Sequence, residues 1–550
     1  MMTPTPISLS KTVLAGLSSL MLAIAPGSPA RGAEEITLSY GPAETSIPIA
    51  DIERFAREGK TTPTLVLYGR LLRIQDGMPL REALTTPFEA SPWSVEQFLN
   101  KPTGEVILRR MGEVVNTGTG ENGFSALRTA IAAAADRPRG LTLLGILQEF
   151  PDREIRIDLE FSLNVMRQTS RVLLEDTAIL EALQQKRTVE NPDRPTPSEP
   201  FNLPGPRQPG PYSWREAEFL FFNPNRDRPS PFYLYIPENL GVPAPLIVIS
   251  HGLGSDPKTF GYVAEHLASH GYAVAIPEHI GTSANRFQGF LEGFERPPEP
   301  SSFADRPLDI TYLLNLLEEK SRSDPAWRNR LDLQNVGVMG QSFGGYTVLA
   351  LAGATLNPEK LEENCLQADE RQITLNLSLL LQCRALEVAP DRRNFRDRRV
   401  KAVIAINPLT SLVFGESGMG AIDVPVAIVA GTNDYITPAV PEQIEPFTWL
   451  DTPDKLLVLF APGTHFSFLQ ENGGQVPIPP QLIGPDPEKA YPYLQALSLT
   501  FFNVHIRDRS DYRAYLSEEY LQTLGPSPFT INLVKTLDLE ELRVPLAANR

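Results

Sequence analysis

Cysteine is nearly absent from this sequence, with two residues in 550, Cys365 and Cys383. Neither lies in a context typical of a nucleophile or a metal ligand, and no metal-ligand spacing of other residue types is present. Glycine motifs of the phosphate-loop and dinucleotide-binding types are also absent. We therefore expect no metal ion and no cofactor.

Positive charge is also in deficit. Lys and Arg number 50 against 66 Asp and Glu, a formal net charge of −16. Because nucleic-acid binding depends on neutralising phosphates, the sequence argues against a nucleic-acid partner.

Long apolar runs are missing except near the N-terminus. There Lys11 precedes the apolar run from Val13 to Ala25, and the small residues Ser28 and Ala30 follow. This order is typical of a secretory signal, and residues 1–33 are predicted to be one, although a retained membrane anchor stays open. We expect an exported protein, located in a periplasm, a thylakoid lumen or outside the cell, with peripheral membrane contact left open.

Export changes the interpretation of the two cysteines. Cys365 and Cys383 are 18 positions apart, and two nearby cysteines in an oxidising compartment are expected to pair. Closing a loop of this size stabilises a fold by about 3 kcal/mol.

Three segments follow the predicted signal. Residues 34–188 are predicted to form a mostly helical domain, which includes a helix over Leu159 to Gln185. Residues 189–213 are rich in proline and are expected to be a stiff, solvated linker. Residues 214–550 alternate strand and helix patterns, which favours an α/β domain with a mainly parallel sheet. Insertions near 281–302 and 355–399 interrupt it where caps over a site would lie.

A Gly-x-Ser-x-Gly motif supplies the candidate nucleophile. Ser342 lies in Gly340-Gln341-Ser342-Phe343-Gly344, between a short apolar strand pattern and an apolar helix pattern. A serine in such a strand-to-helix turn is typical of a nucleophile elbow, where the glycines avoid clashes with neighbouring elements.

A serine hydroxyl needs a base, and the base needs an orienting acid. Two histidines follow Ser342, and His465 lies just after a strand pattern, whereas His505 lies inside a helix pattern. Asp434 lies in the loop after the preceding strand, and its rivals Asp451 and Asp454 lie in a polar stretch. We expect Ser342, Asp434 and His465 to form a catalytic triad.

Two backbone amides are expected to bind the developing oxyanion. One is the N–H of Phe343, which the elbow fixes, and the other is the N–H of Leu253, in the glycine-containing loop after an early strand. His251 in the same loop is predicted to be structural.

These residues resemble the α/β-hydrolase group that contains platelet-activating-factor acetylhydrolases, dienelactone hydrolases and cutinase-like polyesterases. The likeness to the acetylhydrolases is carried by Val248 to Gly254, by Leu267 to Tyr272, by Pro277-Glu278-His279 and by the elbow. The resemblance implies an α/β-hydrolase fold and again assigns the oxyanion hole to Leu253 and Phe343. Residues 34–188 resemble a domain of unknown function that precedes such hydrolases in cyanobacteria.

The acid departs from the acetylhydrolase pattern. Those enzymes place it after the strand that follows the nucleophile, where this chain has Asn407. Asp434, one strand later, matches dienelactone hydrolases and cutinase-like enzymes instead, so specificity for acetylated phospholipids does not transfer.

The sequence predicts an exported serine hydrolase that cleaves carboxylic esters, including lipid-like ones, through an acyl-enzyme. Acyl transfer or peptide cleavage on the same triad remains an alternative, as does a non-catalytic hydrolase-like protein that binds a partner.

Overall fold

The computed structural model describes residues 32–40, 43–63, 65–66, 78–88, 91–100, 102–159, 179, 181–183, 205–291, 294–366, 376–389, 393–470, 480–524 and 528–538. The predicted signal segment, except for residues 32 and 33, and most of the helix predicted over 159–185 lie outside them. Within the described residues, no helix has both the length and the apolar character needed to cross a bilayer.

The chain divides into two compact units, Met1–Met166 and Arg167–Arg550. The division falls inside the range predicted for the first domain, 34–188. Its cause is visible in the packing, because Ile179 and Leu183 belong to the hydrophobic core of the second unit.

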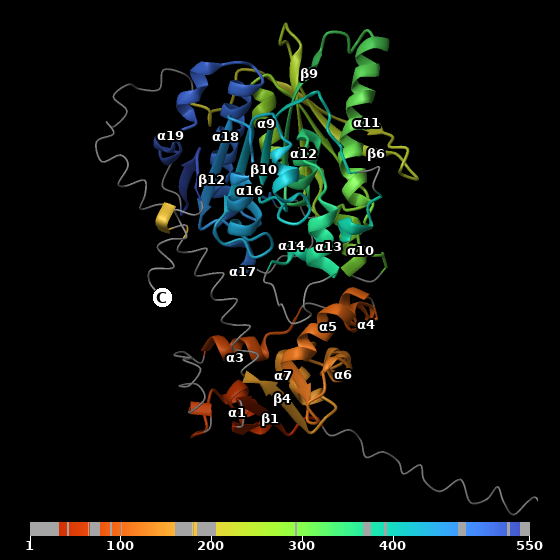
Figure 1. Cartoon of the computed structure of the whole chain (residues 1–550), viewed down its shortest axis with the longest axis vertical. Coiled ribbons are helices and arrows are strands. Elements are labelled where there is room, and N and C mark those ends of the chain that lie inside the picture. The colour runs from red at the N-terminus through yellow and green to blue at the C-terminus, as the bar shows by residue number, and fades with distance from the viewer. Residues whose placement is uncertain are drawn as a thin grey trace, which may run out of the picture. The chain divides into compact units, whose positions relative to one another are not determined.

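The first unit contains six of the described helices (Figure 1): α1 (Ile49–Glu58), α3 (Met78–Thr85), α4 (Pro92–Leu99), α5 (Pro102–Val114), α6 (Phe124–Ala135) and α7 (Leu143–Glu149). It also contains a four-stranded sheet, in the order β2-β1-β4-β3, which the prediction of a mostly helical domain did not include. The strands are β1 (Glu35–Tyr40), β2 (Ala43–Pro48), β3 (Val115–Thr117) and β4 (Glu154–Asp158). They are three to six residues long and mix polar with apolar side chains, so they carry little of the apolar signal of a buried strand.

The second unit is built on a nine-stranded sheet, in the order β13-β12-β11-β10-β9-β7-β8-β6-β5. Its strands are β5 (Trp214–Phe221), β6 (Ser230–Pro237), β7 (Ala244–Ser250), β8 (Ala273–Pro277), β9 (Leu331–Gln341), β10 (Val400–Ile406), β11 (Val426–Gly431), β12 (Lys455–Ala461) and β13 (Thr530–Val534). Strands β7 to β12 are mutually parallel, whereas β5, β6 and β13 pair antiparallel at the two edges. The predicted α/β fold with a mainly parallel sheet is confirmed.

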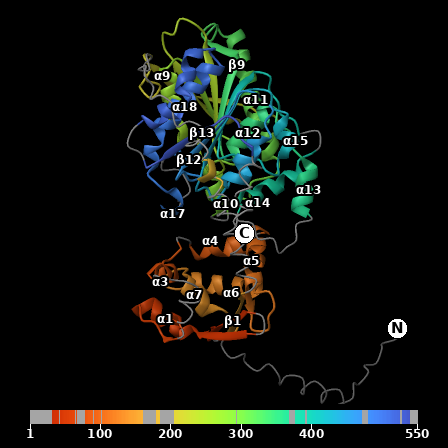
Figure 2. The ribbon, with the colours of Figure 1, turned by 60° about the vertical axis from the view of Figure 1, so that its left-hand side comes forward.

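Helices cover both faces of this sheet (Figure 2). Helices α9 (Gly261–Ser269) and α18 (Tyr491–His505) pack on one face, and α11 (Ser302–Ser323) and α12 (Phe343–Ala352) pack on the other. Because the parallel strands are buried on both faces, they are continuous apolar runs, and the carboxyl ends of all six lie at one edge. The catalytic residues predicted from the sequence follow these ends.

Of the Pro-rich linker predicted over 189–213, the structure describes residues 205–213, most of which are exposed. From residue 205 onward the linker lies against α9, where the Gly210 N–H donates to Ser269 Oγ at 2.9 Å. The Tyr212 N–H donates to the Ser269 carbonyl at 3.0 Å, and His266 Nε2 contacts the Pro206 carbonyl at 2.7 Å. Proline carbonyls remain available as acceptors, so this part of the linker is anchored by hydrogen bonds.

Candidate active site

Ser342 occupies the sharp turn between β9 and α12. Its backbone has φ 58° and ψ −119°, a strained conformation for a residue with a side chain. The Ser342 N–H donates to the Ile406 carbonyl of β10 at 2.8 Å, and the Ser342 carbonyl accepts from the Tyr346 N–H at 3.1 Å. The turn is therefore fixed from both sides, with the Ser342 residue 8% exposed.

Two glycines of the motif are required by close packing. A Cβ on Gly344 would lie 2.0 Å from the Ser250 carbonyl oxygen at the end of β7. A Cβ on Gly340 would lie 2.2 Å from the Gly344 carbonyl oxygen. Neither contact can be relieved without moving backbone, so both glycines set the distance between the elbow and its neighbours.

Asp434 and His465 meet at the carboxyl ends of β11 and β12. His465 Nδ1 lies 2.6 Å from Asp434 Oδ2, and both residues are buried. The Ile436 and Thr437 N–H groups each donate to Asp434 Oδ1 at 2.8 Å. The Thr437 hydroxyl donates to Asp434 Oδ2 at 2.8 Å and lies 3.2 Å from His465 Nδ1. An acceptor at Nδ1 sets the ring tautomer that leaves Nε2 free to accept a proton.

The elbow contacts the loop of His465 at this edge of the sheet. Gln341, which precedes the serine, donates from Nε2 to the His465 carbonyl at 3.0 Å. Ser342, Asp434 and His465 thus each follow a strand that ends at this edge of the sheet, β9, β11 and β12 respectively.

Asn407 stands where the acetylhydrolase pattern has its acid, directly after β10. It is fully buried, and its Oδ1 accepts the Gly431 N–H at 2.8 Å. Its Nδ2 donates to the Thr464 carbonyl at 3.2 Å, and its own carbonyl oxygen lies 3.1 Å from Thr437 Oγ1. Asn407 therefore links the loop of Asp434 to the loop of His465.

The two residues predicted to supply oxyanion donors lie on either side of the elbow. Phe343 begins α12, and the first N–H groups of a helix have no partner within the helix. Leu253 lies in the loop after β7, where a Cβ on Gly252 would lie 3.4 Å from Ser342 Cβ. The loop thus runs directly against the serine, the position that a donor to its oxyanion needs.

A buried polar network lies beneath that loop, and the sequence did not reveal it. His279 Nε2 lies 2.9 Å from Ser250 Oγ, and its Nδ1 lies 2.8 Å from Asp309 Oδ2. The His279 N–H donates to His251 Nε2 at 3.0 Å, and His251 Nδ1 lies 2.8 Å from the Gly252 carbonyl oxygen. Burial holds the pKa of His251 and of His279 well below its ordinary value, so both rings are neutral.

The hydrogen-bond partners of the neutral His251 ring fix its tautomer. A backbone N–H only donates, so His251 Nε2 accepts and its proton is on Nδ1, directed at the Gly252 carbonyl. These contacts agree with the structural role predicted for His251.

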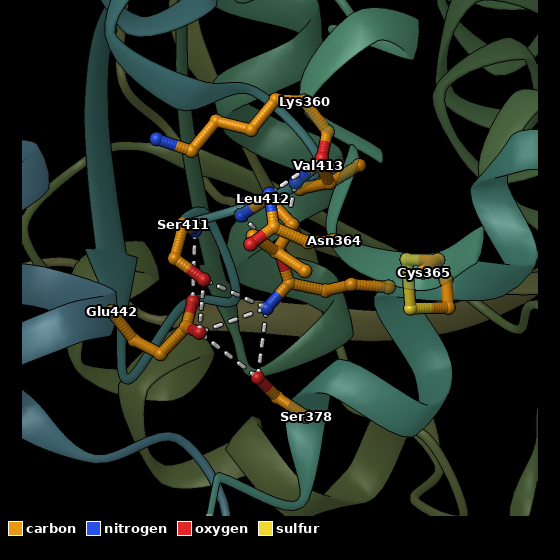
Figure 3. The surroundings of a disulfide bond; sticks show 10 residues. Lys360, Asn364, Cys365, Ser378, Ser411, Leu412, Val413 and Glu442 are labelled. Carbon is orange, nitrogen blue, oxygen red and sulfur yellow. Dashed lines mark hydrogen bonds between the residues drawn. A yellow bond between two sulfur atoms is a disulfide. The ribbon is translucent and has the colours of Figure 1, made fainter. Parts of the chain in front are cut away.

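The second insertion is anchored by a disulfide and by a buried carboxylate (Figure 3). Cys365, at the end of α13 (Pro358–Leu366), is bonded to Cys383, which follows α14 (Ser378–Gln382). This disulfide agrees with the pairing predicted from the sequence.

Glu442 is the carboxylate, in the π-helical turn η4 (Val440–Ile444) after the Asp434 loop, and it is fully buried. Figure 3 shows Ser378 and Ser411 directed at it, with hydrogen bonds of 3.2 and 2.5 Å to Oε1. Asn376 and Gln382 donate to the same oxygen, and the Thr410 and Ser411 N–H groups donate to Oε2. One side chain therefore joins the insertion to the loops after β10 and β11.

The described residues contain no group of three or more His, Cys, Asp or Glu side chains arranged to hold a metal ion. Sequence reasoning missed Thr437 and Glu442, and it named Asn407 only as the position that lacks an acid. Only Thr437 had a local signal, three positions after Asp434.

Similarity to known hydrolases covers two parts of the chain. Residues 32–158 match a family described as alpha/beta hydrolase of unknown function (DUF1400), and residues 239–297 match platelet-activating factor acetylhydrolase, isoform II. The platelet-activating factor acetylhydrolase of the dog, Canis lupus familiaris, is 30% identical over 146 residues, which are 20% of this chain and 33% of that protein. The chain thus spans about a third of the length of this curated relative. Neither family match includes Ser342, Asp434 or His465.

Proposed function

We propose that this chain, an α/β-hydrolase of the group related to platelet-activating factor acetylhydrolases, hydrolyses carboxylic esters with Ser342 as its nucleophile. The observation that carries the proposal is the 2.6 Å contact of His465 Nδ1 with Asp434 Oδ2, at the sheet edge where the elbow presents Ser342. An acid that orients a histidine, at the same sheet edge as a strained serine, is the arrangement expected to make a hydroxyl nucleophilic.

The proposed reaction has two halves. Ser342 Oγ attacks the acyl carbon, His465 Nε2 takes the hydroxyl proton, and the N–H groups of Leu253 and Phe343 bind the oxyanion. His465 then gives the proton to the departing alcohol, which leaves an acyl-enzyme. Water attacks this ester by the same route and releases the acid.

We infer an apolar acyl group from the second insertion. Leu366, Leu377 and Leu380 are 73%, 49% and 41% exposed there, and Tyr435 beside the acid is 49% exposed. The Ser378 N–H donates to the Ile436 carbonyl at 2.9 Å, so this part of the insertion lies directly beside the Asp434 loop. Exposed apolar side chains next to a site favour lipid-like esters and contact with a membrane or lipid surface.

Export is proposed together with this function. The Cys365–Cys383 disulfide supports it, since such bonds persist in oxidising compartments.

The test is hydrolysis of p-nitrophenyl esters from acetyl to palmitoyl by the wild type, by Ser342→Ala and by Ser510→Ala. Ser510 is exposed and serves as the matched serine control. We expect Ser342→Ala to lower kcat by about 10⁴-fold or more with the fold unchanged, and Ser510→Ala to match the wild type. Retained activity in Ser342→Ala would refute the assignment.

The preferred acyl length reports the size of the acyl pocket. Products formed with added alcohols or amines separate hydrolysis from acyl transfer. Cleavage of a matched p-nitroanilide tests the peptidase alternative.

A further inference from the structure

Arg306, in α11, is a fully buried cation that the reaction scheme does not use. Its Nη2 donates to the His251 carbonyl and to Ser250 Oγ, and its Nη1 donates to Thr282 Oγ1. A guanidinium presents five donors in a rigid plane, so these contacts fix the orientation of the whole group.

A fourth donor of the guanidinium reaches the other side of the elbow. Arg306 Nε donates to Thr347 Oγ1 at 3.1 Å, and the Thr347 hydroxyl donates to the Phe343 carbonyl at 2.7 Å. The guanidinium also lies over the Phe343 ring, with Cζ 4.8 Å from the ring centroid. Arg306 thus contacts both segments that carry the proposed oxyanion donors.

The geometry of the peptide bond explains why these contacts matter for the Leu253 amide. His251 Nδ1 holds the Gly252 carbonyl, which shares a planar trans peptide with the Leu253 N–H. The carbonyl and the N–H of one peptide point in opposite directions, so holding the first aims the second. Arg306 holds the adjacent peptide, through the His251 carbonyl.

Further buried polar groups hold Ser250, one of the partners of Arg306. Asp309 accepts from Arg226 Nη2 at 2.7 Å and contacts His279, which in turn contacts Ser250. Burial lowers the pKa of Arg306 and the charge of Asp309 opposes this, so the side chain stays a cation at neutral pH.

We propose that Arg306 is a positioning residue of the oxyanion hole, which holds the Leu253 loop against the first turn of α12. This inference rests on the proposed function. It makes Arg306 necessary for transition-state stabilisation while leaving ground-state binding of the ester to other residues.

The test compares four variants with the wild type. Arg306→Met keeps the length of the side chain but removes its donors, and Arg306→Lys keeps the charge but removes the planar fork. Thr347→Val is nearly isosteric and removes the link to the Phe343 carbonyl. Arg399→Met is the control, because Arg399 is a partly buried arginine paired with Asp397 that precedes β10, at the opposite end of the strand from the site.

Each variant is assayed for thermal unfolding, for kcat and KM with the best p-nitrophenyl ester, and for inhibition by a trifluoromethyl ketone. The ketone forms a tetrahedral adduct with the serine, so its Ki reports the oxyanion hole. We expect Arg306→Met to lower kcat by about 10²-fold with KM within about threefold, and Ki to rise in proportion to the fall in kcat/KM. We expect Thr347→Val and Arg306→Lys to show the same pattern with a smaller loss, and Arg399→Met to keep the wild-type kcat.

Folded Arg306→Met or Arg306→Lys with wild-type kcat and Ki overturns the proposal, and so does a loss that appears in KM alone. If Arg306→Met does not fold, Arg306→Lys and Thr347→Val decide in the same way. A wild type that hydrolyses no ester overturns the proposed function and this inference together. A wild type that is active and loses activity in Ser342→Ala, but not in the Arg306 variants, overturns the inference alone.

Discussion

Asp434 accepts hydrogen bonds from the Ile436 and Thr437 N–H groups, from the Thr437 hydroxyl and from His465 Nδ1. The two N–H groups and the Thr437 hydroxyl fix the orientation of the carboxylate. The carboxylate can then hold the His465 ring in one orientation. We expect Asp434→Asn to lower kcat by about 10⁴-fold, because an amide can donate to Nδ1 and so favours the wrong tautomer of His465. Steady-state hydrolysis of the p-nitrophenyl ester measures the loss.

The rivals for the acid provide the control for this substitution. Asp451 and Asp454 are exposed, so Asp451→Asn is expected to keep kcat within about threefold of the wild type. A large loss of kcat in Asp451→Asn together with an active Asp434→Asn would assign the acid to Asp451 instead of Asp434.

Individual residues differ in how far the sequence could predict them. Ser342, Asp434 and His465 each follow a predicted strand, and parallel strands bring such positions to one edge. Arg306 had no comparable signal, because its partners Ser250, Thr282 and Thr347 come from three other elements at unrelated spacings. A buried side chain that gains its contacts only in the folded chain leaves no local pattern.

At the scale of elements, the hydrogen bonds of Glu442 connect η4 to α14. Glu442→Gln replaces one carboxylate oxygen with an NH₂ group, which faces hydrogen-bond donors and cannot accept from them. Buried donors that lose their acceptor destabilise the fold. We expect this variant to lose about 3 kcal/mol of unfolding free energy. Urea denaturation followed by tryptophan fluorescence measures the change.

Glu416→Gln is the matched control for the Glu442 substitution, since Glu416 is an exposed glutamate on α15 (Gly415–Gly420). Its expected change is within about 0.5 kcal/mol. Equal stability of the two variants would show that the Glu442 hydrogen bonds contribute nothing net.

The parallel strands of the second unit had a stronger sequence signal than the strands of the first unit. Leu246 to Ser250 and Val400 to Ile406 are apolar along their length because both faces of their sheet are covered, which is a strong signal. Strand β13 was missed, since it is a five-residue edge strand with an asparagine at its centre. Strand β4 alternates charged residues with Ile155 and Ile157, a weaker pattern that was overlooked between longer helices.

Over the whole molecule, the histidines make stability sensitive to acid. Burial lowers the pKa of His251, His266, His270, His279 and His505, and that of His266 falls to about 4. The folded chain then binds fewer protons than the unfolded chain below an unfolded-state pKa of about 6.5. The unfolding free energy therefore falls as the pH drops through this value, by up to about 1.4 kcal/mol per pH unit for each histidine. Raised pKa values of Glu265 and Glu278 oppose this loss at lower pH.

His266→Gln isolates one histidine in this acid response. His266 faces His270 and the Pro206 carbonyl, and a glutamine can still donate to that carbonyl. Urea titrations at about pH 7 and about pH 5 measure how much unfolding free energy each protein loses on acidification. We expect this loss to be smaller in the variant than in the wild type by about 1 to 2 kcal/mol. Parallel losses in both proteins would contradict the assignment.

Asn407 has a consequence for how this site can be found by comparison with other sequences. It stands at the strand end where the resemblance places an acid, and its amide now connects the loops of Asp434 and His465. In the proposed triad the acid therefore lies at the neighbouring strand end, while the residue after β10 connects the two loops. A search that follows only aligned positions would find an asparagine after β10 and would take the proposed triad for an incomplete one.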